Sequence, residues 1–244
     1  MAEYQTVHSG VDARSAAIDA GLRAHMNKVY GLMSAALLVS FALAYTIAAS
    51  PAAMNLIFGS PLFYVVVFGP LAFVLVAGFA FHKLSVAAIN GIFWAYAGLT
   101  GASLAIIFAM FNMMDIITGL LFTSIAFLGL TLTGYMTKRD LGPIGQVATM
   151  MAWGLVAIGI GSFFFGGLGE TGFMLFNIAI LGVFAVLTAF STQEIKNTYI
   201  AVSQQGGPEA EMYLEKAAII GALQLYISFI AMFRSIMYLF MSNE

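Results

Sequence analysis

Long apolar stretches, separated by short breaks rich in glycine, proline and polar residues, dominate the pattern of this chain. A helix needs about 20 apolar residues to cross the hydrocarbon core of a bilayer, and seven stretches qualify. Strands do not fit, because an isolated edge leaves its backbone groups unpaired in lipid and barrel strands are shorter and alternate. The pattern therefore predicts an all-α membrane protein with seven transmembrane helices at 27–49, 61–81, 86–109, 114–135, 145–165, 172–195 and 219–241.

Composition supports this class and narrows the partners. Hydrophobic residues make up 61% of the chain and charged residues 8%, with a mean hydropathy of +0.97, whereas soluble domains carry about 25% charged residues. The net charge of -2 offers no basic surface for nucleic acid, which leaves the lipid bilayer, ions and other membrane proteins as partners. The absence of cysteine excludes disulfides and thiolate metal sites.

The positive charges are distributed unevenly along the pattern. Of the nine lysines and arginines, eight lie at or before the start of the first span or in the breaks after the second, fourth and sixth spans. Because such residues accumulate in cytoplasmic loops, we expect a cytoplasmic N-terminus and a C-terminus outside. Residues 1–26, which lack a signal-peptide core, then form a cytoplasmic N-terminal tail, and residues 27–244 form the transmembrane domain. The eight cations are Arg14, Arg23, Lys28, Lys83, Lys138, Arg139, Lys196 and Lys216.

Smaller features predict how the spans pack and connect. Pro70 predicts a bend within the second span, because proline removes a backbone hydrogen bond. The acidic break at 197–218 predicts a solvated linker that ends in the first turn of the last helix. Small residues recur at every fourth position on the first and third spans, where they let helix backbones approach closely in lipid. These residues are Ala36, Ser40, Ala44 and Ala48, and Ala97, Gly101, Ala105 and Ala109.

Signatures of enzymes are missing or misplaced. The run 167–172 matches G-x-G-x-x-G, but it lies between two expected spans with no strand before it, so we interpret it as a turn. An intramembrane serine protease needs a base beside its nucleophile, and His8, His25 and His82 all lie outside the expected spans. Arg234 cannot form the Schiff base of a retinal protein, and no H-E-x-x-H zinc motif occurs. We therefore expect no enzyme activity, no cofactor and no bound metal site.

Polar side chains enter the last two spans along one helical face each. On the sixth span, Thr188, Ser191 and Thr192 can present their hydroxyls together. A polar stripe in a membrane helix should face protein or water, which makes these faces candidates for one shared site. The alternative is that each hydroxyl bonds only to the carbonyl one turn earlier. The stripe on the seventh span consists of Gln224, Ser228, Ala231 and Ser235.

Several motifs resemble the Bax-inhibitor, or YccA-like, family of integral membrane proteins. They are "PLAFVLVAGF" followed by "HKLS" (70–85), "FWAYAGLTGASLAIIF" (93–108), "GYMTKRDL" (134–141), "TAFSTQEIK" (188–196) and "GALQLYISFIAMF" (221–233). The resemblance implies seven helices in which two three-helix layers enclose the C-terminal helix. It also implies the pH-sensitive calcium leak attributed to some members, and links of other members to cell death or to a bacterial inner-membrane quality-control protease.

The chain departs from this family at the two positions that the resemblance assigns to the calcium site. Members with calcium activity typically have aspartates there, and these share a proton, because like charges in a poor dielectric cannot both ionise. This chain has Ser191 and Ser228 instead. Serine does not titrate in the physiological range and holds Ca²⁺ poorly without carboxylates nearby. The resemblance therefore implies an altered sensor site, and we expect any ion flux to lack the pH switch.

Other polar residues near these spans have two interpretations each. Glu194 either pairs with Lys196 at the cytoplasmic rim or contributes to a pore mouth. Asp115, which follows Asn112 at the start of the fourth span, is interpreted as part of a helix cap. Arg234 is costly in a span unless it snorkels or finds a partner, and we favour an anchoring role over a gating contact.

Two functional hypotheses follow for a multi-pass protein of a bacterial inner membrane. The first is a calcium or cation leak channel, also open to protons, whose closed state depends on contact between the last two spans. The candidate pore and sensor positions are Ser191 and Ser228, with supporting positions at Thr188, Thr192, Glu194, Gln224, Arg234 and Ser235. The second is a non-conducting regulator that binds other membrane proteins, such as a membrane protease.

Overall fold

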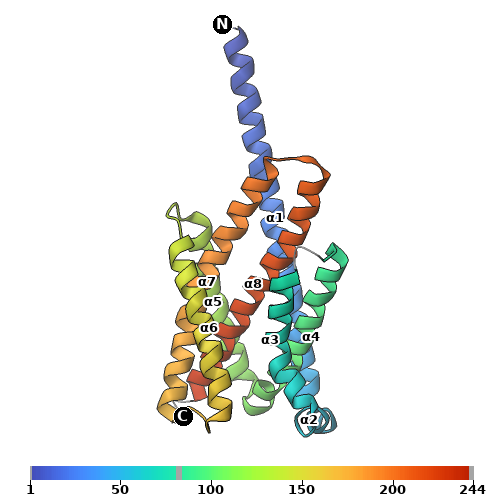
Figure 1. Ribbon diagram of the computed structural model, residues 1–244, viewed down its shortest axis with the longest axis vertical. Coiled ribbons are helices and arrows are strands. Elements are labelled where there is room, and N and C mark those ends of the chain that lie inside the picture. Colours follow the sequence, from blue (N-terminus) through green and yellow to red (C-terminus); the bar gives the residue numbers. More distant parts are fainter. Residues whose placement is uncertain (1, 81–83, 242–244) are drawn as a thin grey trace.

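The chain folds into α-helices joined by short connections (Figure 1). The computed structural model describes the backbone of residues 2–80 and 84–241 and the side chains of residues 18–73 and 84–240. No strand occurs in this part of the chain, in agreement with the expected all-α class. The helices are α1 (Ala2–Ala48), α2 (Pro51–Phe58), α3 (Leu62–Ala80), α4 (Val86–Met110), α5 (Met113–Met136), α6 (Gly142–Phe164), α7 (Gly169–Ser203) and α8 (Gly207–Met241). The side chains of His8, Arg14, His82 and Lys83 lie outside the described residues.

The number of membrane spans depends on how α2 and α3 are counted. Six of the described helices are long and apolar enough to cross a bilayer, and the pair α2 and α3, bent by 71° at the short break between them, makes a seventh if it counts as one span. The connection at 50–60 that the apolar pattern leaves between the first two expected spans is not a simple loop, because it contains α2. This helix begins there because the Ser50 hydroxyl accepts the Ala53 N–H and Pro51 occupies the first turn, where proline is favoured. Pro70 lies inside α3, and a bend at Pro70 stays a prediction.

The last two helices are longer than the apolar pattern predicted. The segment 197–218 is solvated as expected, since its three glutamates are exposed, but the expected linker is wrong, because α7 continues to Ser203 and α8 already begins at Gly207. Gly206 and Gly207 have φ values of +68° and +88°, a backbone conformation that glycine adopts without strain and that permits the sharp turn. Glu209 lies in the first turn of α8, where a negative charge complements the helix dipole.

Other helix ends agree with the sequence. Asn112 is the N-cap of α5, and its Oδ1 atom accepts the Asp115 N–H at 3.0 Å, so the predicted cap is confirmed. Gly166, Gly167 and Gly169 have positive φ values between α6 and α7. The glycine-rich run at 167–172 is therefore a turn that leads into a helix, as interpreted from the sequence.

Helix α8 forms the centre of the bundle. It packs against α1, α4, α5 and α7, and it has the largest buried share of any candidate span in the described part of the chain. Figure 1 shows it running between α3 and α4 on one side and α5, α6 and α7 on the other. Tyr226, Phe233 and Met237 are fully buried, and the Tyr226 ring meets the Tyr96 ring of α4 edge-on at 5.7 Å.

The small-residue stripes pack α1 closely against α4, as predicted. A Cβ atom at Gly101 would lie 2.8 Å from the Ser40 carbonyl oxygen, so only glycine allows this approach. The Ser40 hydroxyl lies 2.8 Å from the carbonyl oxygens of Ala36 and Ala97 and 2.7 Å from the Tyr226 hydroxyl. One buried serine thus links α1, α4 and α8.

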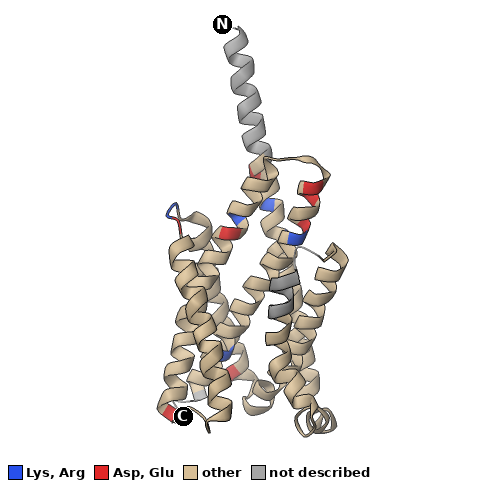
Figure 2. Ribbon diagram, in the orientation of Figure 1, with Lys and Arg blue, Asp and Glu red and all other residues tan. Residues whose placement is uncertain are grey.

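Charged residues gather near the two ends of the bundle, with a long uncharged stretch of ribbon between them (Figure 2). This distribution suits a bundle whose middle lies in lipid. At one end, Lys28 of α1 and Glu215 of α8 form an ion pair at 3.5 Å. The composition, the helix lengths and this charge distribution together identify a multi-pass membrane protein.

Candidate functional site

A cavity of about 480 Å³ lies between α3, α4, α6, α7 and α8. We call it the central cavity and define it by Ser191 of α7 and Ser228 of α8, which both line it. Their side chains are 6% and 3% exposed, and most of the remaining lining is apolar, including Trp153 and Phe184. The structure thus brings the two serines to one cavity, while their role there stays a prediction.

The neighbouring threonines of α7 are satisfied within their own helix. Thr188 donates its hydroxyl to the Phe184 carbonyl at 2.7 Å, and Thr192 donates to the Thr188 carbonyl at 2.9 Å. Both side chains are fully buried, and neither lines the central cavity. By contrast, the hydroxyls of Ser191 and Ser228 have no hydrogen bond to the described residues and remain available to a solute or water.

Glu194 and Gln224 stand between the central cavity and a smaller cavity of about 120 Å³. We call the smaller one the vestibule and define it by His25, Glu194 and Gln224. Helices α7 and α8 are joined by a tight turn and run antiparallel (Figure 1). Glu194, one turn after Ser191 on α7, therefore lies near Gln224, one turn before Ser228 on α8. The two polar residues therefore form a boundary shared by both cavities. Glu194 is the only carboxylate among the described residues that line either one.

His25 is a site residue that the sequence did not reveal. It was expected in the N-terminal tail, but it lies in α1, is 8% exposed and faces the vestibule. Its ring packs against the Tyr199 ring at 5.1 Å, and its Nε2 atom has no hydrogen-bond partner. A buried imidazole nitrogen without a partner gains stability from water or a polar solute. This makes the vestibule a polar compartment.

The polar neighbours of Glu194 along α7, Gln193 and Lys196, form their hydrogen bonds with residues of α5 and of the α5–α6 connection and not with Glu194. Lys196 donates to the Tyr135 carbonyl of α5 at 2.8 Å and lies 5.0 Å from the Tyr135 ring centre, so its expected pairing with Glu194 is wrong. Gln193 accepts the Leu141 N–H and donates to the Arg139 carbonyl, both at 2.8 Å. Gln193 thus joins α7 to the α5–α6 connection, and Lys196 joins it to the last turn of α5. Neither residue bonds to Glu194, which lines both cavities.

Two proposed supporting residues lie apart from the cavities. Arg234 and Ser235 line neither the central cavity nor the vestibule. Arg234 is half-buried and has no ion pair within the described part of the chain, whereas Ser235 is fully buried. The choice between anchoring and gating for Arg234 stays open.

The polar groups of the two cavities suit weak, transient binding of an ion better than tight coordination. Among the described residues, no group of three or more histidine, aspartate or glutamate side chains is placed to hold a metal ion. Ca²⁺ takes six to eight oxygen ligands, usually with several carboxylates. One carboxylate, one amide and two hydroxyls can replace part of a hydration shell, but they cannot form a closed site.

Comparison with known proteins gives the family. Residues 22–244 match the sequence profile described as "Inhibitor of apoptosis-promoting Bax1". The chain belongs to this Bax-inhibitor family. An uncharacterized protein from Caulobacter vibrioides is 36% identical over 96% of this chain and 94% of its own. The "Inner membrane protein YbhL" of Escherichia coli is 32% identical over 91% and 92%, and an uncharacterized protein of Rickettsia prowazekii is 30% identical over 92% of both.

Proposed function

We propose that this Bax-inhibitor protein is a cation leak of the bacterial inner membrane, with Ca²⁺ as a candidate ion and no enzymatic activity. The observation that carries the proposal is the pair of cavities that share Glu194, whose side chain is exposed, and the half-buried Gln224. A cavity bounded by low-dielectric walls concentrates the field of a single carboxylate and attracts cations. Its inner-membrane location is supported by the Escherichia coli relative, which is named an inner membrane protein.

The two serines make the proposed leak a weakened or altered one. Neither Ser191 nor Ser228 carries charge, so neither binds Ca²⁺ tightly or shares a proton with the other. The proposal also includes the arrangement of two three-helix layers around α8, with contact between α7 and α8 setting the closed state. The position of α8 between two groups of helices supports this arrangement (Figure 1).

Glu194→Gln should reduce Ca²⁺ entry into dye-loaded liposomes at least about threefold, because it removes the only carboxylate that lines the described cavities. The substitution keeps the size and the polarity of the side chain. Glu211→Gln is the matched control, since Glu211 is exposed on α8 and lines neither cavity. Equal rates in wild type and Glu194→Gln would contradict a path past Glu194.

The proposed topology has the N-terminus in the cytoplasm and the C-terminus outside. Alkaline phosphatase fused after Glu244 should then be active, and the enzyme fused at Gly207 should be inactive, because it folds only outside the cytoplasm. The opposite pattern, activity at Gly207 and none after Glu244, would contradict this topology, either in its orientation or in the crossing of α2 and α3 as one span. Figure 1 places the α7–α8 turn and the end of α8 at opposite ends of the bundle, so only one of the two fusions should be active.

The second candidate function is a non-conducting regulator that binds a membrane protein such as a quality-control protease. The start of α8 favours it, because Met212 and Tyr213 are 51% and 39% exposed next to acidic Glu209 and Glu211. An exposed apolar and acidic helix end suits contact with a partner. The absence of ion flux through wild-type protein in liposomes would select this function over the leak.

A further inference from the structure

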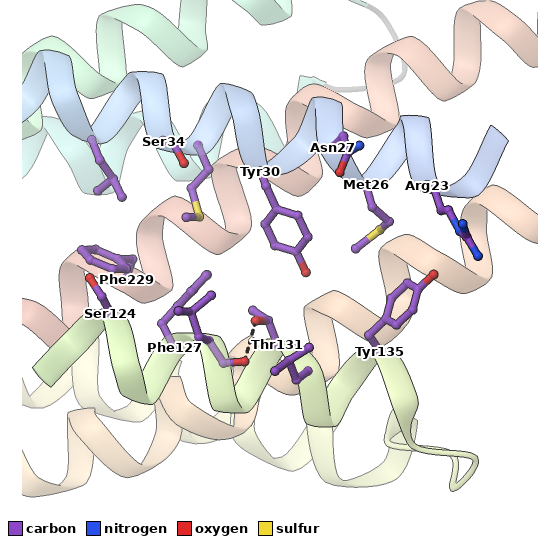
Figure 3. A pocket seen from close by; sticks show the side chains of 14 residues that line it. Arg23, Met26, Asn27, Tyr30, Ser34, Ser124, Phe127, Thr131, Tyr135 and Phe229 are labelled. Carbon is purple, nitrogen blue, oxygen red and sulfur yellow. Dashed lines mark hydrogen bonds between the residues drawn. The ribbon is translucent and has the colours of Figure 1, made fainter. Parts of the chain in front are cut away.

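A groove separates α1 from α5 on the side of the bundle away from the central cavity. Helix α1 packs against α4, α7 and α8, and α5 packs against α7 and α8, so the two helices border a gap whose floor includes Phe229 of α8. Its volume is about 590 Å³. Figure 3 shows side chains of α1 and α5 facing each other across this space.

The walls are apolar along most of the groove, and it opens to the membrane. Met33 and Phe127 lie 6% and 3% exposed in its walls, and Phe229 is 4% exposed. Leu128 and Leu132 of α5 also line the groove but are 60% and 58% exposed, so they form its rim. Because this rim lies within a candidate span, the groove opens sideways toward lipid chains and not toward water.

One end of the groove carries positive charge and polar groups. Figure 3 places Arg23 and Tyr135 together at one end and Ser124 and Phe229 toward the other. Arg23 is exposed and has no carboxylate within ion-pair distance among the described residues. The Lys196 ammonium group, 5.0 Å from the Tyr135 ring centre, brings a second cation to this end. A guanidinium group at the membrane surface is well suited to a phosphate, which it can bind with two hydrogen bonds.

We propose that this groove binds an anionic phospholipid, with one acyl chain between α1 and α5 and the headgroup phosphate at Arg23. The apolar part of the groove accommodates the acyl chain, and the positive charge of Arg23 at one end complements the negative charge of the phosphate. The volume falls in the usual range of small-molecule sites, roughly 300–1,000 Å³.

The proposal can be tested with photo-crosslinking in vesicles. The probe is a phosphatidylglycerol with a diazirine on one acyl chain, and the same chain on phosphatidylcholine is the comparison. Wild-type protein should label on α1 and α5 and should favour phosphatidylglycerol. Ser34→Trp, which fills the groove from an exposed position, should lower labelling at least fivefold. Leu38→Trp, one turn away, 72% exposed and outside the groove, should leave labelling unchanged.

The headgroup is tested separately. Arg23→Gln should abolish the preference for phosphatidylglycerol, whereas Lys216→Gln should retain it, since Lys216 does not line the groove. Leu132→Trp fills the groove from α5 and replaces Ser34→Trp if that variant fails to fold. Equal labelling of the Ser34→Trp and Leu38→Trp variants, equal labelling by both lipids in wild type, or crosslinks to a second protein chain in the groove would each overturn the proposal. No readout here depends on ion flux, so the proposed leak and the lipid site fail independently.

Discussion

Replacing Ser191 and Ser228 together by aspartate should make the thermal unfolding of this protein in detergent respond to Ca²⁺. Both side chains are almost fully buried and line the central cavity, so the double substitution places two carboxylates at one cavity. Carboxylate oxygens are preferred Ca²⁺ ligands, which two hydroxyls cannot replace. With free Ca²⁺ about 100 times the Kd, binding stabilises the folded state by about 2.7 kcal/mol, equivalent to roughly 5–10 °C in Tm.

Without Ca²⁺, the double variant Ser191→Asp/Ser228→Asp should be less stable than the wild type. Two adjacent carboxylates in a poor dielectric retain a shared proton in the folded state, whereas the unfolded chain releases both protons near neutral pH. The folded state then binds more protons, and stability falls as the pH rises. The stabilisation by Ca²⁺ should therefore be larger at about pH 8 than at about pH 6.

The controls for this experiment separate charge from size. Ser191→Asn with Ser228→Asn gives nearly the same volume without charge and should show no Ca²⁺ response. Each single aspartate variant should respond less than the double variant, because a lone buried carboxyl tends to stay protonated. A double variant that folds but keeps the same Tm with and without Ca²⁺ would show that the two serines do not form one ion site.

Gly134→Ala should lower the free energy of unfolding by about 2 kcal/mol or more, because it forces two helix backbones apart. A Cβ atom at Gly134 of α5 would overlap the Ala189 carbonyl oxygen and lie 2.9 Å from the Ala189 Cα atom of α7. A backbone neighbour cannot rotate away as a flexible side chain can. Unfolding in detergent, followed by circular dichroism or denaturant titration, measures the loss.

Gly129→Ala is the matched control on the same helix. No heavy atom would lie within 4 Å of its Cβ atom, so the substitution should be neutral or stabilise by up to about 1 kcal/mol through helix propensity. Similar stabilities for the two alanine variants would show that α5 and α7 can separate at Gly134 without cost. The helix contact beside Ser191 would then be looser than the structure indicates.

Hydropathy located the membrane helices but not their ends. The apolar stretches predicted α4, α5 and α6 closely, since turns with glycine, proline or capping residues follow them at once. By contrast, α7 and α8 continue into polar residues such as Asn197 and Glu211 until the glycines at 206 and 207. Hydropathy marks where lipid ends, whereas a helix ends only where its backbone hydrogen bonds stop. Helix α2 was missed because eight residues are too few for a span.

The site was predictable where it depended on helical periodicity. Ser191 and Ser228 line one cavity because each lies on the polar face of its helix and the two helices are adjacent. His25 was missed because the first span was started too late, although Leu22, Met26 and Val29 already follow helical spacing and are buried. The bonds of Gln193 could not be predicted, since its partners belong to a connection more than 50 residues earlier in the chain.

The central position of α8 has a consequence for how the bundle is made. Translation produces α8 after the seven other helices, yet α8 supplies the surface on which α1, α4, α5 and α7 pack. Before it inserts, Ser40 lacks the Tyr226 hydroxyl and Ser191 faces a space without its opposite wall. Until α8 inserts, the earlier helices therefore form an open shell in the bilayer, in which Ser40 is bonded only to the carbonyls of Ala36 and Ala97. Insertion of α8 is therefore the last step in the assembly of the bundle. A chain truncated before Gly207 would expose the surfaces that α8 normally covers to lipid and to membrane proteases.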